Sequence, residues 1–219
     1  MSQINFEFDS LVSFDRDSLI VGSSNDEAVA WIDKWPEWKE KIILIYGERS
    51  SGKTHLLHCW AKISKANIIE GINFKEIPYE LISKNKHLAI DNASKIEEEL
   101  FLHFINIVLE EKGTLFIADR KPPAFWNIKL PDLKSRLLSI SSIELRRPDD
   151  ILLQLLMSKL FQDKQLQINK DVITYAISRI ERSYEAVNSF VEDLDYRSLN
   201  QNRSININLA REVLDRIHD

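Results

Sequence analysis

The chain has 219 residues and a net charge of −5 at pH 7. This length allows one large domain, or a main domain with a smaller appendage. The acidic balance argues against a surface that follows nucleic-acid phosphates over the whole molecule, although a local basic patch is compatible with it. Cys59 is the single cysteine, so an internal disulfide is excluded. Neither a secretory signal pattern nor a membrane-spanning apolar stretch is found, so we expect a cytoplasmic protein.

Short apolar runs rich in β-branched residues alternate with helical patterns over the first two thirds of the chain. The strand candidates span residues 42–46, 66–69, 86–91, 114–119 and 139–145. The helix candidates among them span residues 25–34, 54–62 and 95–111. Ser24 and Ser94 are the expected caps of the first and the last of these helices. The alternation predicts an α/β fold with a parallel five-stranded sheet flanked by helices.

The pattern changes after Arg147. Beyond it the chain offers helices only, over residues 149–162, 170–179, 183–196 and 209–217. We therefore expect a C-terminal all-helical subdomain over residues 148–219. The α/β core would span residues 14–147, and residues 1–13 would form an extended N-terminal tail.

The most informative motif lies at residues 47–54, which read Gly-Glu-Arg-Ser-Ser-Gly-Lys-Thr and complete the phosphate-loop pattern G-x-x-x-x-G-K-[ST]. Backbone N–H groups of such a loop and the positive end of the following helix hold a polyphosphate. Lys53 adds a positive charge for the β- and γ-phosphates, and the Thr54 hydroxyl is the expected Mg²⁺ ligand. The alternative, a glycine turn beside a surface lysine, is disfavoured because the chain has only five glycines. The loop predicts that the chain binds ADP or ATP with Mg²⁺.

Asp91 ends a strand candidate that we expect to lie beside the strand of the phosphate loop. An acid in this place binds Mg²⁺ in P-loop ATPases, whereas the alternative is an aspartate that caps the next helix. Asn92 follows, where many such ATPases carry a glutamate that polarises the attacking water. An amide cannot accept a proton at neutral pH. The site is therefore predicted to hold a nucleotide and to hydrolyse it slowly on its own.

Two further residues are candidates for contact with phosphate. Asp119 ends the next strand candidate, where it could reach the γ-phosphate from the side or simply cap the following turn. Arg136 lies in the segment Asp132–Leu137, and its planar guanidinium suits bidentate phosphate contact, although an arginine on a helix surface is usually only solvated.

These segments together resemble the AAA+ domain of the DnaA family of bacterial replication initiators, from about Phe14 to the end of the chain. The resemblance assigns residues 19–25 to the segment that wraps the adenine, and residues 89–92 to the Walker B motif in an Asp-Asn form. It makes Asp119 the sensor 1 residue and Arg136 an arginine finger that acts on a partner's nucleotide. The nucleotide-binding residues that it implies are Ile20, Val21, Gly47, Arg49, Ser50, Ser51, Gly52, Lys53, Thr54, His55 and Arg182.

The resemblance has one clear departure, in the helix that usually presents the sensor 2 arginine to the nucleotide. Glu185 stands at the arginine position. Arg182 precedes it by about one helical turn and could take over the role.

The N-terminal residues 3–8 read Gln-Ile-Asn-Phe-Glu-Phe and are similar to the short peptides that dock on the bacterial sliding clamp. An extended strand would place Ile4, Phe6 and Phe8 on one side, where they could enter a groove together with Gln3 at the start. The alternatives are a disordered tip or an edge strand that packs on the body of the protein.

The resemblance implies a bacterial cytoplasmic regulator that docks on the sliding clamp, the β subunit of DNA polymerase III. It would promote hydrolysis of ATP bound to DnaA and so restrain initiation, with weak ATPase activity of its own. Because the DnaA DNA-binding domain is expected to be missing, neither sequence-specific DNA binding nor membrane binding is expected. Assembly into a homo-oligomer stays open. The alternatives are a helicase-loading ATPase that resembles DnaC and a small-molecule kinase with the same loop.

Overall fold

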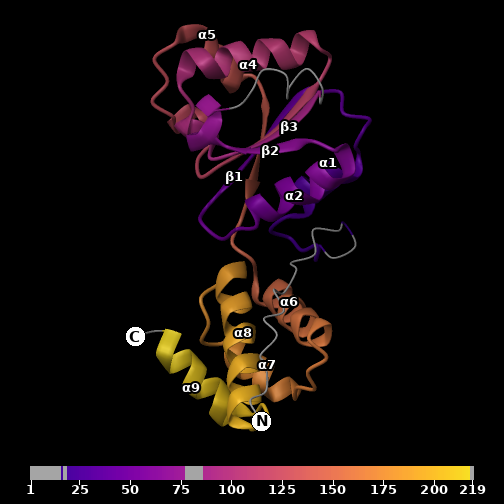
Figure 1. Ribbon diagram of the computed structural model, residues 1–219, viewed down its shortest axis with the longest axis vertical. Coiled ribbons are helices and arrows are strands. Elements are labelled where there is room, and N and C mark those ends of the chain that lie inside the picture. The colour runs from indigo at the N-terminus through magenta and orange to yellow at the C-terminus, as the bar shows by residue number, and fades with distance from the viewer. Residues whose placement is uncertain (1–15, 17–18, 77–85, 218–219) are drawn as a thin grey trace, which may run out of the picture.

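The computed structural model describes residue 16, residues 19–76 and residues 86–217, which form an α/β lobe and a helical lobe (Figure 1). The α/β lobe contains five strands: β1 (Ile42–Gly47), β2 (Asn67–Glu70), β3 (His87–Asp91), β4 (Thr114–Asp119) and β5 (Ser141–Leu145). They pair in parallel in the order β2-β3-β4-β1-β5. The fold class predicted from the sequence is confirmed, and all five strand candidates form.

The order of the strands corrects one expectation. Asp91 does not end a strand next to the phosphate-loop strand, because β4 lies between β1 and β3. All six residues of β4 are buried, including both terminal ones. Such a continuously buried run belongs in the middle of a sheet that is covered on both faces. Asp91 must therefore reach the phosphate loop from two strands away.

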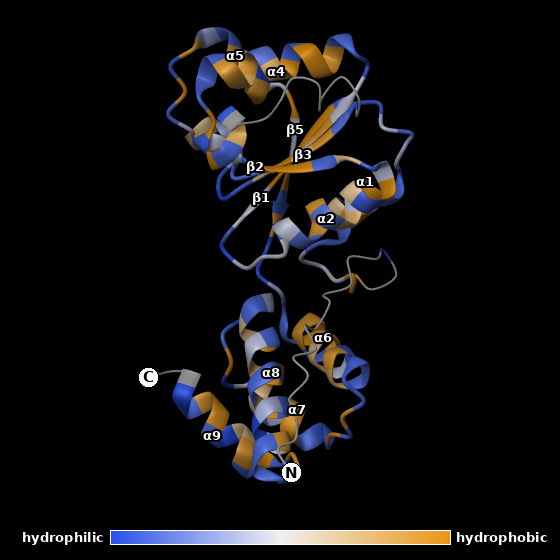
Figure 2. Cartoon of the chain, in the orientation of Figure 1, coloured by the Kyte–Doolittle hydropathy of each residue, from blue (hydrophilic) through white to orange (hydrophobic). Residues whose placement is uncertain are grey.

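Helices cover both faces of the sheet (Figure 1). They are α1 (Asp26–Asp33), α2 (Lys53–Ser64), α4 (Glu98–Glu110) and α5 (Pro131–Leu138). Ile43 and Ile45 belong to a buried cluster with α1 and α2, whereas Ile42 and Leu44 belong to one with α4 and α5. This alternation follows from the two-residue period of a strand. Figure 2 shows the strands as hydrophobic over much of their length.

The predicted helix caps differ from the observed ones. The helix expected after Ser94 begins only at Glu98, and a short 3₁₀ turn, η3 (Ala93–Lys95), precedes it. The Ser94 amide donates to the Asp119 carboxylate at 2.7 Å, so this residue is tied to the end of β4. At the first helix Asn25, one residue after Ser24, holds the cap position.

The helical lobe is built from α6 (Asp150–Asp163), α7 (Lys170–Ile177), α8 (Tyr184–Gln201) and α9 (Ile207–Ile217). These helices share a core of their own, in which Leu153, Phe190 and Val213 are fully buried. Asp149 and Ser183 cap α6 and α8 through their side chains. Among the residues that the structure describes, no helix has the length and apolar character needed to cross a bilayer.

Candidate nucleotide-binding site

The phosphate loop connects the end of β1 to the start of α2. Ser50 has φ 58° and Gly52 has φ 92°, so the backbone turns through the left-handed region twice within three residues. Such turns direct successive N–H groups into one concavity, which binds anions. Gly47 is required for a different reason, because a Cβ there would lie 2.4 Å from the Leu145 carbonyl oxygen. The loop thus places its amides and the positive end of α2 around one point.

Lys53 lies inside this loop, with only 8% of its surface exposed. Its ammonium donates to the carbonyl oxygens of Gly47 at 2.9 Å and Glu48 at 2.6 Å. Burial lowers the pKa of Lys53, and the negative charge of Asp91 acts in the opposite direction. A cation so poorly hydrated interacts strongly with an anion that enters the loop.

The two predicted Mg²⁺ ligands meet at the same place. The Thr54 hydroxyl donates to Asp91 Oδ2 at 2.6 Å, and the other carboxylate oxygen of Asp91 accepts the Asn92 amide at 2.9 Å. One hydroxyl and one carboxylate fit Mg²⁺, which keeps several waters and takes few protein oxygens beside those of a bound phosphate. The described residues hold no cluster of three or more acidic, histidine or cysteine side chains that would form a cage for a metal.

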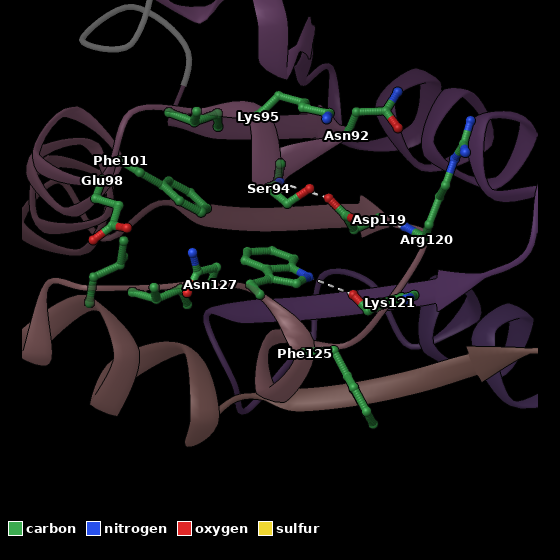
Figure 3. Close-up of a pocket in the computed structure, with 15 residues that line it drawn as sticks. Asn92, Ser94, Lys95, Glu98, Phe101, Asp119, Arg120, Lys121, Phe125 and Asn127 are labelled. Carbon is green, nitrogen blue, oxygen red and sulfur yellow. Dashed lines mark hydrogen bonds between the residues drawn. The ribbon is translucent and has the colours of Figure 1, made fainter.

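Asp119 lies on the opposite face of the sheet from Asp91. Its carboxylate accepts the backbone amides of Ser94 at 2.7 Å and Arg120 at 2.6 Å, so both oxygens are engaged. It lines a cavity of about 540 Å³, and Phe125 and Trp126 are among the other lining residues. Figure 3 labels Asp119 and Phe125 at this cavity. The hydrogen bond from the Arg120 amide is one that a cap of the following turn would make, and the sensor 1 role stays a prediction. The negative charge of Asp119 still acts on Lys53, where it raises the pKa.

The helical lobe reaches the phosphate loop through the first residues of α8. The Tyr184 amide donates to the Ser50 carbonyl at 3.3 Å, and the Tyr184 ring lies 3.4 Å from the Cβ position of Gly52. Glu185 accepts a hydrogen bond from the Ser50 hydroxyl and lies 3.6 Å from the Arg49 guanidinium. Sequence reasoning overlooked Tyr184. The available signal was an aromatic residue directly after the Ser183 cap, opposite a loop that contains a glycine.

Arg182 does not lie at the phosphate loop. Its guanidinium pairs with Asp150 at the start of α6, with distances of 2.8 and 3.1 Å, and both side chains are exposed. Their pairing lowers the pKa of Asp150. The residue that the lobe does bring to the loop is therefore the acidic Glu185.

The expected adenine segment lies beside this contact. The Asn25 side chain donates to the Ile20 carbonyl at 2.9 Å and accepts the Gly22 amide at 2.8 Å, which closes residues 20–25 into a compact turn. The same side chain donates to the Tyr184 hydroxyl at 3.2 Å, while Val21 is 44% exposed.

His55 lies in the first turn of α2, where burial lowers the pKa of its imidazole. It follows the phosphate loop directly, and its contact with a nucleotide stays a prediction. Arg136 lies far from this region, on α5, which lies at the end of the α/β lobe away from the helical lobe (Figure 1). None of the ion pairs among the described residues includes its guanidinium. The predicted clamp contacts Gln3, Ile4, Phe6 and Phe8 fall outside the described residues.

A parallel sheet in this order, a phosphate loop after β1 and a following helical lobe define the AAA+ fold. No family model matches the sequence. An uncharacterized protein of Haemophilus influenzae is 24% identical over 192 residues, which cover 81% of this chain and 83% of that protein. The replication initiator DnaA of Cutibacterium acnes is 25% identical over 227 residues, which cover 90% of this chain but only 45% of the initiator.

Solved structures show the same likeness. Domain III of DnaA from Thermotoga maritima superimposes with a TM-score of 0.79 at 16% identity, covering 92% of this chain and 95% of that domain. DnaA from Aquifex aeolicus bound to AMPPCP gives a TM-score of 0.73 at 17% identity, covering 85% of this chain and 66% of that structure. The chain therefore has the AAA+ fold seen in domain III of DnaA.

Proposed function

We propose that the chain is a nucleotide-binding AAA+ regulator of bacterial replication initiation, similar to Hda, the DnaA-related inactivator of the initiator. The observation that carries this proposal is the assembly of Lys53, Thr54 and Asp91 at one loop, on a fold shared with DnaA. In this reading the chain acts in the bacterial cytoplasm, docks on the DNA-loaded sliding clamp and promotes hydrolysis of ATP bound to DnaA.

The phosphate loop would hold the nucleotide, ADP or ATP, through its backbone amides and Lys53. Thr54 and Asp91 would hold Mg²⁺, which neutralises charge on the phosphates. The segment at Ile20 and Val21 would cover the adenine, and Tyr184 lies close enough to this segment to limit its movement. AMPPCP, the nucleotide analogue carried by the similar Aquifex aeolicus structure, supports this assignment.

Arg136 would act on the nucleotide of a neighbouring DnaA subunit. Its helix packs against α4, away from the chain's own loop, and the ion pairs of the described residues leave its guanidinium without a carboxylate. A planar fork can contact two oxygens of a transferring phosphoryl group. Arginine fingers of this kind raise hydrolysis rates by roughly 10³–10⁵.

The test mixes clamp on DNA, DnaA preloaded with labelled ATP, and the protein or its Arg136→Ala variant. We expect the variant to fold, to bind ADP and to fail in stimulating hydrolysis. Arg136→Lys should also fail, because a point charge lacks the planar fork. Lys134→Ala, which removes an exposed cation from the same helix, is the matched control. Equal hydrolysis with Arg136→Ala and the unchanged protein would exclude Arg136 from the mechanism.

The proposed clamp contact has its own test. Replacing Gln3, Phe6 and Phe8 by alanine should abolish binding to immobilised clamp and leave ADP affinity unchanged. Apolar anchors in a groove contribute about 1–3 kcal/mol each. Retention equal to that of the unchanged protein would refute the docking role. A parallel pull-down with DnaA and with the replicative helicase would separate this proposal from a helicase loader.

A further inference from the structure

The cavity drawn in Figure 3, of about 540 Å³, combines a buried apolar floor with exposed aromatic surface. Phe101 and Leu133 line it and belong to the buried core between the sheet and helices α4 and α5. Trp126 also lines it, and its indole N–H donates to the Lys121 carbonyl oxygen at 2.7 Å, which fixes the ring. Phe125, a further lining residue, is 74% exposed. The cavity can therefore accept apolar or aromatic groups of a partner.

The charges that this cavity offers to solvent are positive. Lys95, Arg120 and Lys121 line it and are exposed, and none of the ion pairs among the described residues includes them. Its two carboxylates, Asp119 and Glu98, instead accept hydrogen bonds from two backbone amides each, at 2.6–3.0 Å. The three cations are therefore available to an acidic partner, although the chain as a whole carries a net charge of −5.

The first 15 residues of the chain, which precede the described part, have the complementary composition. Their charged side chains are three carboxylates, Glu7, Asp9 and Asp15, without a lysine or arginine among them. Phe6 and Phe8 alternate with the first two of these acids. An extended backbone would place both aromatic rings on one side, where they could enter the cavity together. The flexible stems of the exposed lysines could then reach the carboxylates.

The tail of the same molecule is poorly placed to reach this cavity. Arg16 pairs with Asp33 at the end of α1, and α1 packs on the face of the sheet opposite to the one that carries the cavity. Phe8 precedes Arg16 by eight residues, which span at most about 29 Å when fully extended. This segment would have to run around an edge of the sheet and past the helices on both faces. A second molecule meets no such constraint.

We propose that this cavity is the docking site for residues 1–15 of a second copy of the chain, with Phe6 and Phe8 in the cavity and Glu7 and Asp9 paired with its cations. Two molecules can exchange tails in this way, or the contacts can continue from one molecule to the next. A tail held in the cavity is withheld from other partners. Self-association would therefore compete with docking on the clamp, and this consequence alone rests on the proposed function.

A fluorescently labelled synthetic peptide of residues 1–15 measures the docking directly by anisotropy. The receptor is the full chain with Phe6→Ala and Phe8→Ala, so that its own tail does not compete for the cavity. We expect saturable binding that weakens as salt is added. Adding Lys121→Glu or Phe125→Ala to the receptor should weaken binding about fivefold or more, and both sites are exposed, so the fold should be retained. Lys129→Glu, at an exposed cation outside the cavity lining, is the matched control.

Charge reversal tests the ion pairing and the second molecule together. Sedimentation velocity of the full chain, without nucleotide, gives the association constant. Glu7→Lys and Lys121→Glu should each lower this constant about fivefold or more. An equimolar mixture of the two variants should associate more strongly than either variant alone, because the mixed pair restores opposite charges at both contacts. Such a rescue requires the tail of one molecule to lie in the cavity of another.

Several results would overturn the proposal. They are an absence of saturable peptide binding, equal binding of a scrambled peptide, and equal weakening by Lys129→Glu and Lys121→Glu. Peptide binding without self-association of the unchanged protein would assign the cavity to the tail of the same molecule. Displacement of the peptide by a lower concentration of a single-stranded oligonucleotide would assign it to nucleic acid. These assays contain no clamp, DnaA or nucleotide, so their failure leaves the proposed function untouched.

Discussion

The two sides of the candidate nucleotide site are built in different ways. On the α/β side, Lys53 and Asp91 are buried, and the Thr54 hydroxyl bonds directly to Asp91. On the side of the helical lobe, the contact between Glu185 and Arg49 is exposed, with 58% and 78% of these side chains accessible. Strand register and a tight loop fix the positions of the groups on the α/β side. The contact on the helical side depends on charges that are exposed to solvent.

This difference assigns the two sides different tasks. Buried, hydrogen-bonded groups keep their geometry and interact strongly with a charge placed among them. Exposed ion pairs contribute little and are weakened by salt. Phosphate affinity should therefore come from the α/β side, and the helical lobe should adjust it by small factors.

The largest expected effect comes from Lys53→Ala. Without the ammonium, phosphates would keep backbone contacts only, so affinity for ADP and ATP should fall tenfold or more, by about 1.5–3 kcal/mol. Calorimetry measures this directly, and Lys39→Ala removes an exposed lysine as the control. Unchanged affinity would mean that the loop does not hold phosphate. The α/β side would then not be the main source of nucleotide affinity.

Thr54→Val should act through the metal. The variant keeps the shape of the side chain and removes the hydroxyl, so most of the gain in nucleotide affinity on adding Mg²⁺ should disappear, a change of about fivefold to tenfold. Titrations without Mg²⁺ serve as the internal control and should match the unchanged protein. Thr54→Ser should restore the Mg²⁺ effect. A full Mg²⁺ response in Thr54→Val would remove this hydroxyl from the metal site.

The contrast between the buried α/β side of the site and its exposed helical side also explains how much the sequence could predict. The shape of the loop and the place of Thr54 were predictable because a strand, a tight turn and a helix in series leave one way to arrange them. Asp119 was ambiguous between two roles; its carboxylate is held by the Ser94 and Arg120 amides, and its sensor 1 role stays a prediction. The order of the strands could not be predicted, since chain order does not fix spatial order.

The contacts between the helical lobe and the phosphate loop could not be predicted from the sequence for another reason. Arg182 was the expected partner of the phosphates because it shares a helical spacing with Glu185. The helix starts only at Tyr184, so Arg182 precedes the cap and points to Asp150 instead. The expected start at residue 183 was right to within one residue, so the error lies in extending helical spacing to Arg182, which precedes the cap.

Glu185→Gln tests the modest influence of the helical lobe. Removing a negative charge beside the loop should raise affinity for nucleotides about twofold to fivefold, because like charges repel but are screened by solvent at an exposed site. The gain should be larger for ATP than for ADP, since ATP carries more charge, and should shrink as salt is added. Glu181→Gln, an exposed carboxylate before the same helix, is the control. A tenfold or greater gain would mean that Glu185 affects nucleotide affinity as strongly as Lys53 does, which would contradict a modest influence of the helical lobe.

The smallest effect is expected from Tyr184→Phe, which keeps the ring on Gly52 and removes only the hydroxyl that accepts from Asn25. Nucleotide affinity should change by less than about twofold, and stability should fall by about 0.5–1.5 kcal/mol. Burial raises the pKa of Tyr184 to about 12. In the unfolded chain the pKa of a tyrosine is about 10.

Because the unfolded chain loses this proton more readily, the stability that Tyr184 contributes is complete below about pH 10 and declines between about pH 10 and 12. Denaturant titrations of both proteins across this range should therefore show a difference in unfolding free energy that shrinks as pH rises. Tyr196→Phe, at an exposed tyrosine of the same helix, should show no such trend. A constant difference would mean that the Tyr184 hydroxyl is hydrated, so that only its ring joins the helical lobe to the loop.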